Sequence, residues 1–281
     1  MNFIKILYFL ICKKEIVFIA STLQYINFIE YKNLNKQNQS FFKKTKIFIR
    51  CNSRKEAKLI YNMNKKMNKG LNQILDLRKN MYNFLIFFLF KLRKFFNPID
   101  LGIIGDYNNY TFKELYKVSK NRVILDDGTN ALNFKNLFNL NKKNSKLFSF
   151  FDKKIFNHNK IIKNDFRFLK ANIKNQKKEA SLYILGNPWV QNGIVDFENY
   201  VLTLKKILKK YKKLKIFYLP HPKETNEILK KYSFLNIIKP NYPIEIFLIT
   251  KAIIPGHIVG FNSTAFILIK KLYENKIKLT N

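Results

Sequence analysis

Short apolar runs alternate with segments of helical character along most of this 281-residue chain. Residues 15–20 are apolar on both faces of an extended backbone, which is typical of a strand buried in a parallel sheet. Ser21 and Thr22 follow, and they can cap a helix over residues 23–31. The repeated order of strand and helix predicts an α/β fold. Runs of the same kind recur at residues 46–51, 101–104, 122–125, 181–185, 214–217, 235–238 and 252–254.

Two series of this kind follow one another, so we expect two Rossmann-like domains facing each other across a central cleft. The N-terminal domain is predicted over residues 14–140, where Ser53 and Glu56 have the spacing of a helix capping box. Residues 141–178 are rich in Lys, Asn and Phe with little periodicity, and they are interpreted as a linker. The C-terminal domain is then predicted over residues 179–281.

Residues 81–96 form a very apolar segment that carries Lys91, Arg93 and Lys94 near its end. This segment predicts a helix, for which two environments are considered. It can pack in the core, or it can lie as a basic-aromatic helix on an anionic membrane surface. We favour core packing.

The chain is strongly basic, with 53 Lys and Arg against 18 Asp and Glu and a net charge of +35. Such a charge predicts attraction to nucleic acid, to an anionic membrane face or to phosphorylated sugars. The alternative is compositional drift, because Lys, Asn, Ile, Phe and Tyr are abundant throughout, as in proteins from AT-rich genomes. The usual sequence signatures of nucleic-acid-binding modules are missing, so we expect no nucleic acid partner.

The two cysteines, Cys12 and Cys51, have neither zinc-ligand spacing nor the pattern of a disulfide framework.

Residues 3–12 are apolar, but Lys13 ends the run and no small-residue cleavage site follows, so no signal peptide is expected. No stretch reaches the roughly 18 apolar residues that a membrane-spanning helix needs. We therefore expect a cytoplasmic protein, with peripheral attachment to the inner face of the cytoplasmic membrane as a further possibility.

His221 stands between Pro220 and Pro222, directly after a predicted strand and before a polar helical segment. The prolines fix the backbone on both sides and remove N–H donors, which would hold the imidazole at the strand's end. Ligands of open parallel sheets bind at that carboxyl edge. A lone histidine is nevertheless more often structural than catalytic.

Asp126, Asp127 and Gly128 follow another predicted strand. Two adjacent carboxylates repel each other, so one of them should have a raised pKa in a dry site and can act as a base. The alternative is an Asx turn with solvated acids. The pair lacks the one-residue gap of an Asp-x-Asp metal site, and no metal is expected.

Ser263 and Thr264 open the last predicted helix, where hydroxyl and backbone N–H groups can bind a phosphate. Ordinary N-capping explains the same residues equally well. Glu245, near the start of the preceding helix, can accept hydrogen bonds from a ribose. As a lone glutamate, it would more often be a solvated surface acid.

The three groups, each at a strand's end and in this order, resemble the signature of bacterial sialyltransferases of glycosyltransferase families 38, 52 and 80. The resemblance covers roughly residues 15–270 and implies a GT-B fold, CMP-sialic acid as the donor and no required metal or cofactor. The matching stretches are Ile124-Leu125-Asp126-Asp127-Gly128-Thr129, Leu219-Pro220-His221-Pro222-Lys223-Glu224 and Gly260-Phe261-Asn262-Ser263-Thr264-Ala265, with weaker matches at residues 18–24, 185–188 and 240–245.

The resemblance also implies roles. Asp127 would deprotonate the acceptor hydroxyl, and Asp126 would support or orient it. His221 would stabilise or protonate the departing CMP phosphate, as a histidine that stays protonated beside that group. The implied donor-binding residues are Pro222, Glu245 for the CMP ribose or base, and Ser263 and Thr264 for the phosphate.

The sequence thus predicts an inverting sialyltransferase that acts on a hydroxyl of a surface glycan or glycolipid, either lipooligosaccharide or capsular polysaccharide. A GT-B transferase with another nucleotide sugar is the nearest alternative, because a fold does not fix the donor. A non-catalytic basic protein that binds membrane or nucleic acid is the second.

Overall fold

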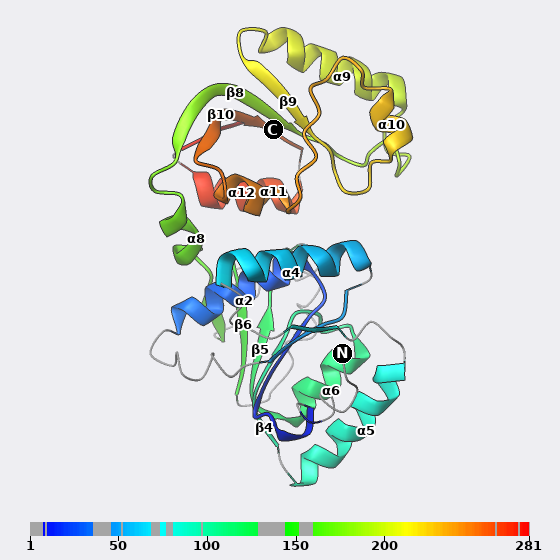
Figure 1. Cartoon of the computed structure of the whole chain (residues 1–281), viewed down its shortest axis with the longest axis vertical. Coiled ribbons are helices and arrows are strands. Elements are labelled where there is room, and N and C mark those ends of the chain that lie inside the picture. Colours follow the sequence, from blue (N-terminus) through cyan, green and yellow to red (C-terminus); the bar gives the residue numbers. More distant parts are fainter. Residues whose placement is uncertain are drawn as a thin grey trace. The chain divides into compact units, whose positions relative to one another are not determined.

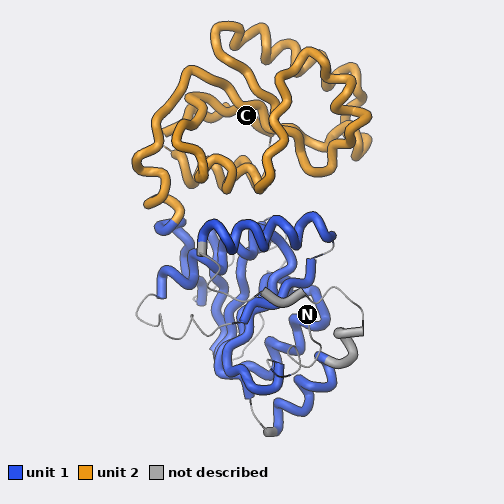
Figure 2. The backbone as a smooth tube through the Cα atoms, viewed as in Figure 1, with its two compact units in different colours: residues 1–168 blue, residues 169–281 orange. Residues whose placement is uncertain are grey.

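The computed structural model describes residues 8, 10–35, 46–51, 53–68, 74–76, 81–96, 98–128, 144–151, 160–261, 263–274 and 276–280. The chain divides into two compact units, unit 1 over Met1–Phe168 and unit 2 over Leu169–Asn281 (Figure 2). Each unit has its own sheet with helices packed around it (Figure 1).

Unit 1 is built on a seven-stranded sheet in which every paired strand is parallel to its neighbour. The central strands are apolar and buried on both faces, which explains why they appear in the sequence as continuous apolar runs. The strand order is β3-β2-β1-β4-β5-β6-β7. The strands are β1 (Glu15–Ile19), β2 (Lys46–Ile49), β3 (Ile74–Asp76), β4 (Ile99–Ile104), β5 (Ser119–Leu125), β6 (Ser145–Ser149) and β7 (Ile161–Lys163).

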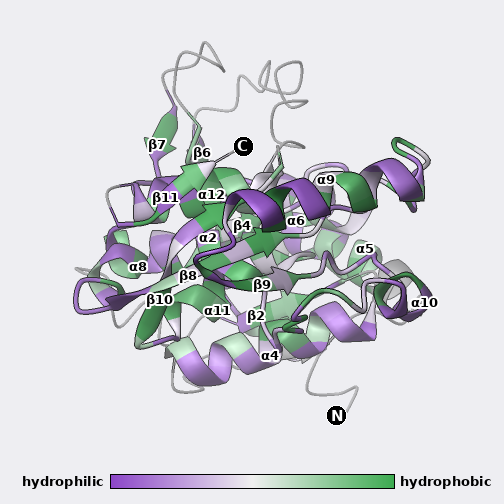
Figure 3. Cartoon of the chain, turned by 90° about the horizontal axis from the view of Figure 1, so that it is seen from above, coloured by the Kyte–Doolittle hydropathy of each residue, from purple (hydrophilic) through white to green (hydrophobic). Residues whose placement is uncertain are grey.

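Among the residues of unit 1 that the structure describes, four helices have nine or more residues. They are α2 (Thr22–Leu34), α4 (Arg54–Asn68), α5 (Met81–Phe96) and α6 (Tyr110–Val118). One face of the sheet packs with α5 and α6, where Phe18 of β1 lies against Phe90 and Phe112. Helix α2 packs against β1, β5, β6 and α4. Figure 3 shows hydrophobic strands, and alternating hydrophobic and hydrophilic residues on α4.

The predicted linker over residues 141–178 is wrong. This stretch contains β6, β7, the short helix α8 (Arg167–Asn172) and the start of β8. Leu147 and Phe148 are buried, and β6 pairs directly with β5, so the first sheet continues well beyond residue 140. These runs are only three to five residues long, and their burial is a tertiary effect that weak periodicity does not reveal.

Unit 2 has a four-stranded parallel sheet in the order β11-β10-β8-β9. Residues 235–238, predicted as a strand, contribute only one isolated bridge, between Tyr218 and Ile237. The strands are β8 (Lys177–Leu185), β9 (Lys215–Leu219), β10 (Ile253–Val259) and β11 (Lys278–Thr280). The helices are α9 (Phe197–Lys210), α10 (Asn226–Lys230), α11 (Ile244–Ile249) and α12 (Thr264–Tyr273).

The strand order reverses once in each sheet. In unit 1 the chain moves outward from β1 through β2 to β3, and then restarts on the other side of β1 with β4. In unit 2 it moves from β8 to β9 and restarts with β10 on the other side of β8. Ligands of open α/β sheets bind beyond the carboxyl ends of the strands at such reversals. The fold therefore marks one edge in each unit as a candidate site.

The predicted α/β class, with one parallel sheet in each of two units, is confirmed. The predicted central cleft concerns the two units together and stays a prediction. Among the described residues, no helix has the length and hydropathy that crossing a bilayer requires.

Candidate functional site

Asp126 is fully buried at the carboxyl end of β5 and holds the turn that follows it. Its Oδ1 accepts a hydrogen bond of 2.7 Å from the N–H of Gly128. Its Oδ2 accepts from the Ser149 hydroxyl, and from the N–H of Phe150 at 3.3 Å. Gly128 has φ 70°, a left-handed conformation that glycine adopts without strain. Asp126 therefore orients the loop rather than facing solvent.

Burial raises the pKa of Asp126 to about 7, although its three hydrogen bonds work in the opposite direction. The neighbouring charge of Asp127 adds a smaller upward shift. The sequence predicted one raised carboxyl pKa in this pair, and the structure places it on Asp126. The alternative of an Asx turn is right for the backbone, because Asp126 Oδ1 accepts from the N–H of Gly128 two residues on, but Asp126 is buried and therefore not solvated.

Asp127 is partly exposed and faces the start of α2. The Ser21 hydroxyl donates a hydrogen bond of 2.8 Å to Asp127 Oδ1. Ser21 is also the N-cap of α2, and its Oγ accepts from the N–H of Gln24 at 3.2 Å. The capping role was predicted from the sequence, but the bond to Asp127 joins the ends of β1 and β5 and was not.

Glu56 is a second carboxylate near Asp127 that sequence reasoning missed. Its Oε1 accepts from the N–H of Thr22 at 3.4 Å. Burial raises the pKa of Glu56, and the charge of Asp127 raises it further. The capping-box prediction is half right, because Ser53 Oγ does accept from the N–H of Glu56 at 3.1 Å. The glutamate side chain caps α2 instead of its own helix.

In unit 2, His221 follows β9 in a tight turn closed by Glu224. The His221 N–H donates to Glu224 Oε2 at 2.5 Å, and the Glu224 N–H donates to the His221 carbonyl at 2.9 Å. The ring Nδ1 accepts from the N–H of Lys223 at 3.2 Å, so Nε2 carries the proton of the neutral ring. The sequence assigned Glu224 no role, although its position three residues after His221 is a detectable signal.

Burial lowers the pKa of His221, and the charge of Lys223 lowers it further. The ring is therefore neutral near pH 7 in the chain alone, and a permanently protonated His221 is not what the structure shows. An imidazolium at this position needs the negative charge of a bound group, which would raise the pKa again.

A buried hydrogen-bond chain connects the His221 turn to the end of β8. Tyr218 Oη donates to Glu224 Oε1 at 2.6 Å and lies 3.1 Å from Tyr200 Oη. The N–H of Asn187 donates to Tyr200 Oη at 3.2 Å. A Cβ on Gly186 would collide with Glu224 Oε2 and would approach the His221 nitrogen to 2.9 Å. Only glycine lets these two loops meet.

Ser263 is the N-cap of α12, and its Oγ accepts from the N–H of Phe266 at 3.2 Å. The capping interpretation is thus confirmed for Ser263, while phosphate binding stays a prediction. Thr264 is the first residue of the helix, and both residues are half-buried. Asn262 lies outside the described residues.

Glu245 and Pro222 complete the predicted donor-binding set. Glu245 lies in the first turn of α11 and is buried, so its interpretation as a solvated surface acid is wrong. Burial raises its pKa. Pro222 is exposed next to His221. Their contacts with a donor stay predictions.

In each unit, the structure places some of the predicted residues at one edge of the sheet. Strands β9 and β10 flank β8, so His221 and Ser263 lie at the same sheet edge, separated by one strand. Strands β9 and β10 themselves are two strand spacings apart, about 10 Å. Asp126, Asp127, Ser21 and Glu56 share the corresponding edge of unit 1. The described residues contain no group of three or more His, Cys, Asp or Glu side chains placed to hold a metal ion.

Comparison with known proteins gives a match in fold but none in sequence. No protein-family model matches the chain, and no curated protein matches it. Solved structures do match. A UDP-GlcNAc 2-epimerase from Methanocaldococcus jannaschii, in complex with UDP-GlcNAc and UDP, aligns with TM-score 0.55 and 14% identity over 94% of this chain and 83% of that chain.

Two further epimerases align in the same way. The UDP-N-acetylglucosamine 2-epimerase from Rickettsia bellii gives TM-score 0.56 and 10% identity over 95% of this chain and 78% of its own. The UDP-GlcNAc 2-epimerase from Neisseria meningitidis, bound to UDP-GlcNAc, aligns with TM-score 0.51 and 13% identity over 90% of this chain and 79% of that chain. At these identities the likeness shows the fold alone. The chain has the GT-B-like α/β fold of these structures. The resemblance to sialyltransferases is not confirmed, since these structures are of a different enzyme.

Proposed function

We propose that this chain is a nucleotide-sugar enzyme in which unit 2 binds the phosphate of the nucleotide and unit 1 supplies the acid–base carboxylates. The observation that carries the proposal is the edge of the unit 2 sheet, where His221 and the N-terminus of α12 leave the strands on either side of β8. Two of the epimerases of like fold were solved with UDP-GlcNAc, one of them also with UDP, which supports a ligand of this class.

The groups at this edge suit a phosphate. The neutral His221 ring presents an Nε2–H donor, since its Nδ1 is occupied by the Lys223 N–H. The first N–H groups of α12 and the Ser263 hydroxyl add further donors at the positive end of a helix dipole. A phosphate there would raise the pKa of His221 and turn it into a cationic partner of the leaving group.

The groups in unit 1 suit proton transfer. Asp127 is partly exposed, fixed by Ser21 and placed near a second carboxyl group, Glu56, whose pKa is raised. Two carboxyl groups with different proton affinities can serve as a base and an acid. Asp126 beneath them holds the loop.

Two reactions are candidates for this machinery. The ordered Asp-Asp-Gly, His-Pro and Ser-Thr groups favour transfer of sialic acid from CMP-sialic acid to a glycan hydroxyl. Asp127 would take the hydroxyl proton as the new bond forms at the anomeric carbon. The bond from that carbon to the phosphate oxygen would break with inversion, and CMP would leave with the electron pair beside His221.

The likeness to UDP-GlcNAc 2-epimerases favours the second candidate, a reaction on a UDP-sugar. Calorimetric titration of the full chain with CMP, UDP and GDP distinguishes the two. CMP affinity supports the first, and UDP affinity the second. If none of the three nucleotides binds, the proposal is wrong.

Nucleotide release from CMP-sialic acid and UDP-GlcNAc then tests the residues. We expect Asp127→Asn and His221→Ala each to lower the rate by on the order of a hundredfold or more. Asp165→Asn, which changes an exposed acid of unit 1, is the matched control and should retain the rate. Full activity in both site variants would contradict the assignment.

A further inference from the structure

Helix α5 exposes a stripe of large apolar side chains. Phe88, Leu92 and Phe95 are 54%, 42% and 78% exposed. Their spacing of four and three residues places them on one side of the helix. Ile86 and Phe90 are fully buried, and they pack with the core of unit 1. The core-packing interpretation of residues 81–96 therefore holds for one side of this helix and fails for the other.

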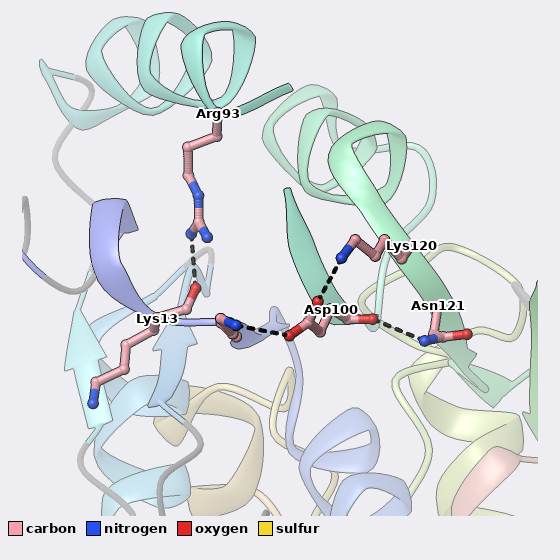
Figure 4. A network of polar contacts seen from close by, with 6 residues as sticks. Lys13, Arg93, Asp100, Lys120 and Asn121 are labelled. Atoms are coloured by element: carbon pink, nitrogen blue, oxygen red, sulfur yellow. Dashed lines mark hydrogen bonds and ion pairs between the residues drawn. The ribbon is translucent and has the colours of Figure 1, made fainter. Parts of the chain in front are cut away.

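The rotation of α5 is fixed by a buried arginine. Arg93 points inward, and its Nη1 donates to the carbonyl oxygen of Leu10 at 2.7 Å. The same nitrogen donates to the carbonyl oxygen of Lys13 at 2.8 Å (Figure 4). Turning the helix to hide the stripe would break both bonds and expose Ile86 and Phe90, which are now in the core. The exposure of Phe88, Leu92 and Phe95 is thus built into the fold.

The surroundings of the stripe are basic and aromatic. Lys91 and Lys94 are exposed on the same helix, and none of the sixteen residues of α5 is acidic. The Lys91 ammonium lies 4.3 Å from the Phe87 ring centroid. Tyr110 of α6, which is itself exposed, extends the aromatic surface, with its ring 5.4 Å from that of Phe87.

We propose that this outer face of α5 docks on an anionic lipid bilayer, with Phe88, Leu92 and Phe95 entering the boundary between head groups and acyl chains. Lys91 and Lys94 would lie at the level of the lipid phosphates, as their flexible stems allow. A helix of sixteen residues is about 24 Å long and would lie in the plane of the surface. This inference is independent of the nucleotide-sugar chemistry.

Charge complementarity favours lipid over a second copy of the chain. Two copies that meet at this face would bring together their lysines, and each carries a net charge of +35. An anionic bilayer instead offers both an apolar phase for the stripe and negative charge for the lysines. Contiguous exposed apolar side chains often mark an interaction site.

Co-sedimentation of the full chain with vesicles tests the proposal. One vesicle is phosphatidylcholine alone, and the other has an equal part of phosphatidylglycerol. We expect binding to the anionic vesicle, and a decrease in partition on the order of tenfold or more in Lys91→Glu/Lys94→Glu. The triple variant Phe88→Ser/Leu92→Ser/Phe95→Ser should lose binding to a similar extent.

The matched control is Lys205→Glu/Lys209→Glu on α9, which makes the same charge change at exposed positions of unit 2. It should reduce partition much less than the α5 pair. An equal reduction would show non-specific attraction and overturn the proposal, as would failure of the wild-type chain to bind anionic vesicles. If the wild-type chain is a dimer and the triple variant is a monomer, the face binds a second copy of the chain and the lipid proposal is wrong.

Nucleotide titration of every variant separates this test from that of the proposed function. Variants of α5 should bind nucleotide as the wild type does, which also shows that they are folded. If no variant and no wild-type chain binds nucleotide, the proposed function fails while the vesicle result stands.

Discussion

The Ser21 hydroxyl donates a hydrogen bond of 2.8 Å to Asp127 Oδ1 across 106 residues of sequence. The same oxygen caps α2 by accepting from the N–H of Gln24. One serine therefore fixes the start of a helix and the orientation of the proposed base. Because the helix N-terminus carries partial positive charge, it also favours the ionised carboxylate.

We expect Ser21→Ala to lower the rate of nucleotide release on the order of tenfold, because a hydrogen bond to a charged group is lost. Loss of the N-cap should also reduce the free energy of unfolding by about 1 kcal/mol. Rate assays and urea denaturation measure the two effects. Ser21→Thr keeps the hydroxyl and should retain most of the rate and most of the free energy of unfolding. If the Thr and Ala variants lose equally in rate, the hydrogen bond from residue 21 to Asp127 does not contribute to it.

Gly186→Ala should disrupt the His221 turn. The new Cβ would lie 2.6 Å from Tyr218 Oη and 2.9 Å from the His221 nitrogen, and it would collide with Glu224 Oε2. We expect nucleotide affinity to fall at least about tenfold and the free energy of unfolding to fall by roughly 1–3 kcal/mol. Calorimetric titration and chemical denaturation give the two values.

Gly256→Ala is the matched control for this change. Its Cβ would meet a single atom, the Glu179 carbonyl oxygen at 3.0 Å, and no part of the His221 turn. It should leave nucleotide affinity unchanged. If the Gly186 variant binds nucleotide as tightly as this control, the network does not position His221.

Asp126 should make stability depend on pH. Its pKa is about 7 in the folded chain against 3.8 as the ordinary value, so the folded state holds the proton more tightly. The contribution is favourable below the ordinary pKa and is lost as pH rises through about 7, by at most about 4 kcal/mol. Denaturation midpoints of wild type and Asp126→Asn across this window measure it.

The Asp126→Asn variant is expected to be less stable at acidic pH but to lose the slope between about pH 4 and pH 7. Asp165→Asn, at an exposed position, should keep the wild-type slope. An unchanged slope in Asp126→Asn would assign the pH dependence to other groups, such as Glu56 and Glu245, whose pKa values burial also raises.

Local sequence predicted many of the strands and helices, because the signals are local. The run Glu15–Ile19 is apolar on both faces, and Ser21 and Ser263 cap the helices that follow them. The same reasoning failed for β6 and β7. Their few residues show no periodicity. They are strands because β6 pairs with the edge of β5, and β7 in turn pairs with β6.

The candidate site was predictable only as a set of strand ends. The sequence placed Asp127, His221 and Ser263 after strands, since strand and turn signals are contiguous in the chain. It did not show that Glu56 lies near Asp127 or that Glu224 closes the His221 turn. Those contacts depend on strand order and side-chain direction, which local patterns do not encode.

By itself, the sequence determined the alternation of strand and helix, the caps and the positions of the polar strand ends, because each follows from neighbouring residues. Only the tertiary structure decided the pairings. Sheet order brought Ser21 to Asp127, and burial raised the pKa of Asp126 and lowered that of His221. Hydrogen bonds to the carbonyl oxygens of Leu10 and Lys13 hold Arg93 inward, on the side of α5 opposite the exposed stripe. Desolvation and contacts between residues far apart in the sequence exist only in the folded chain, so local sequence patterns do not reveal them.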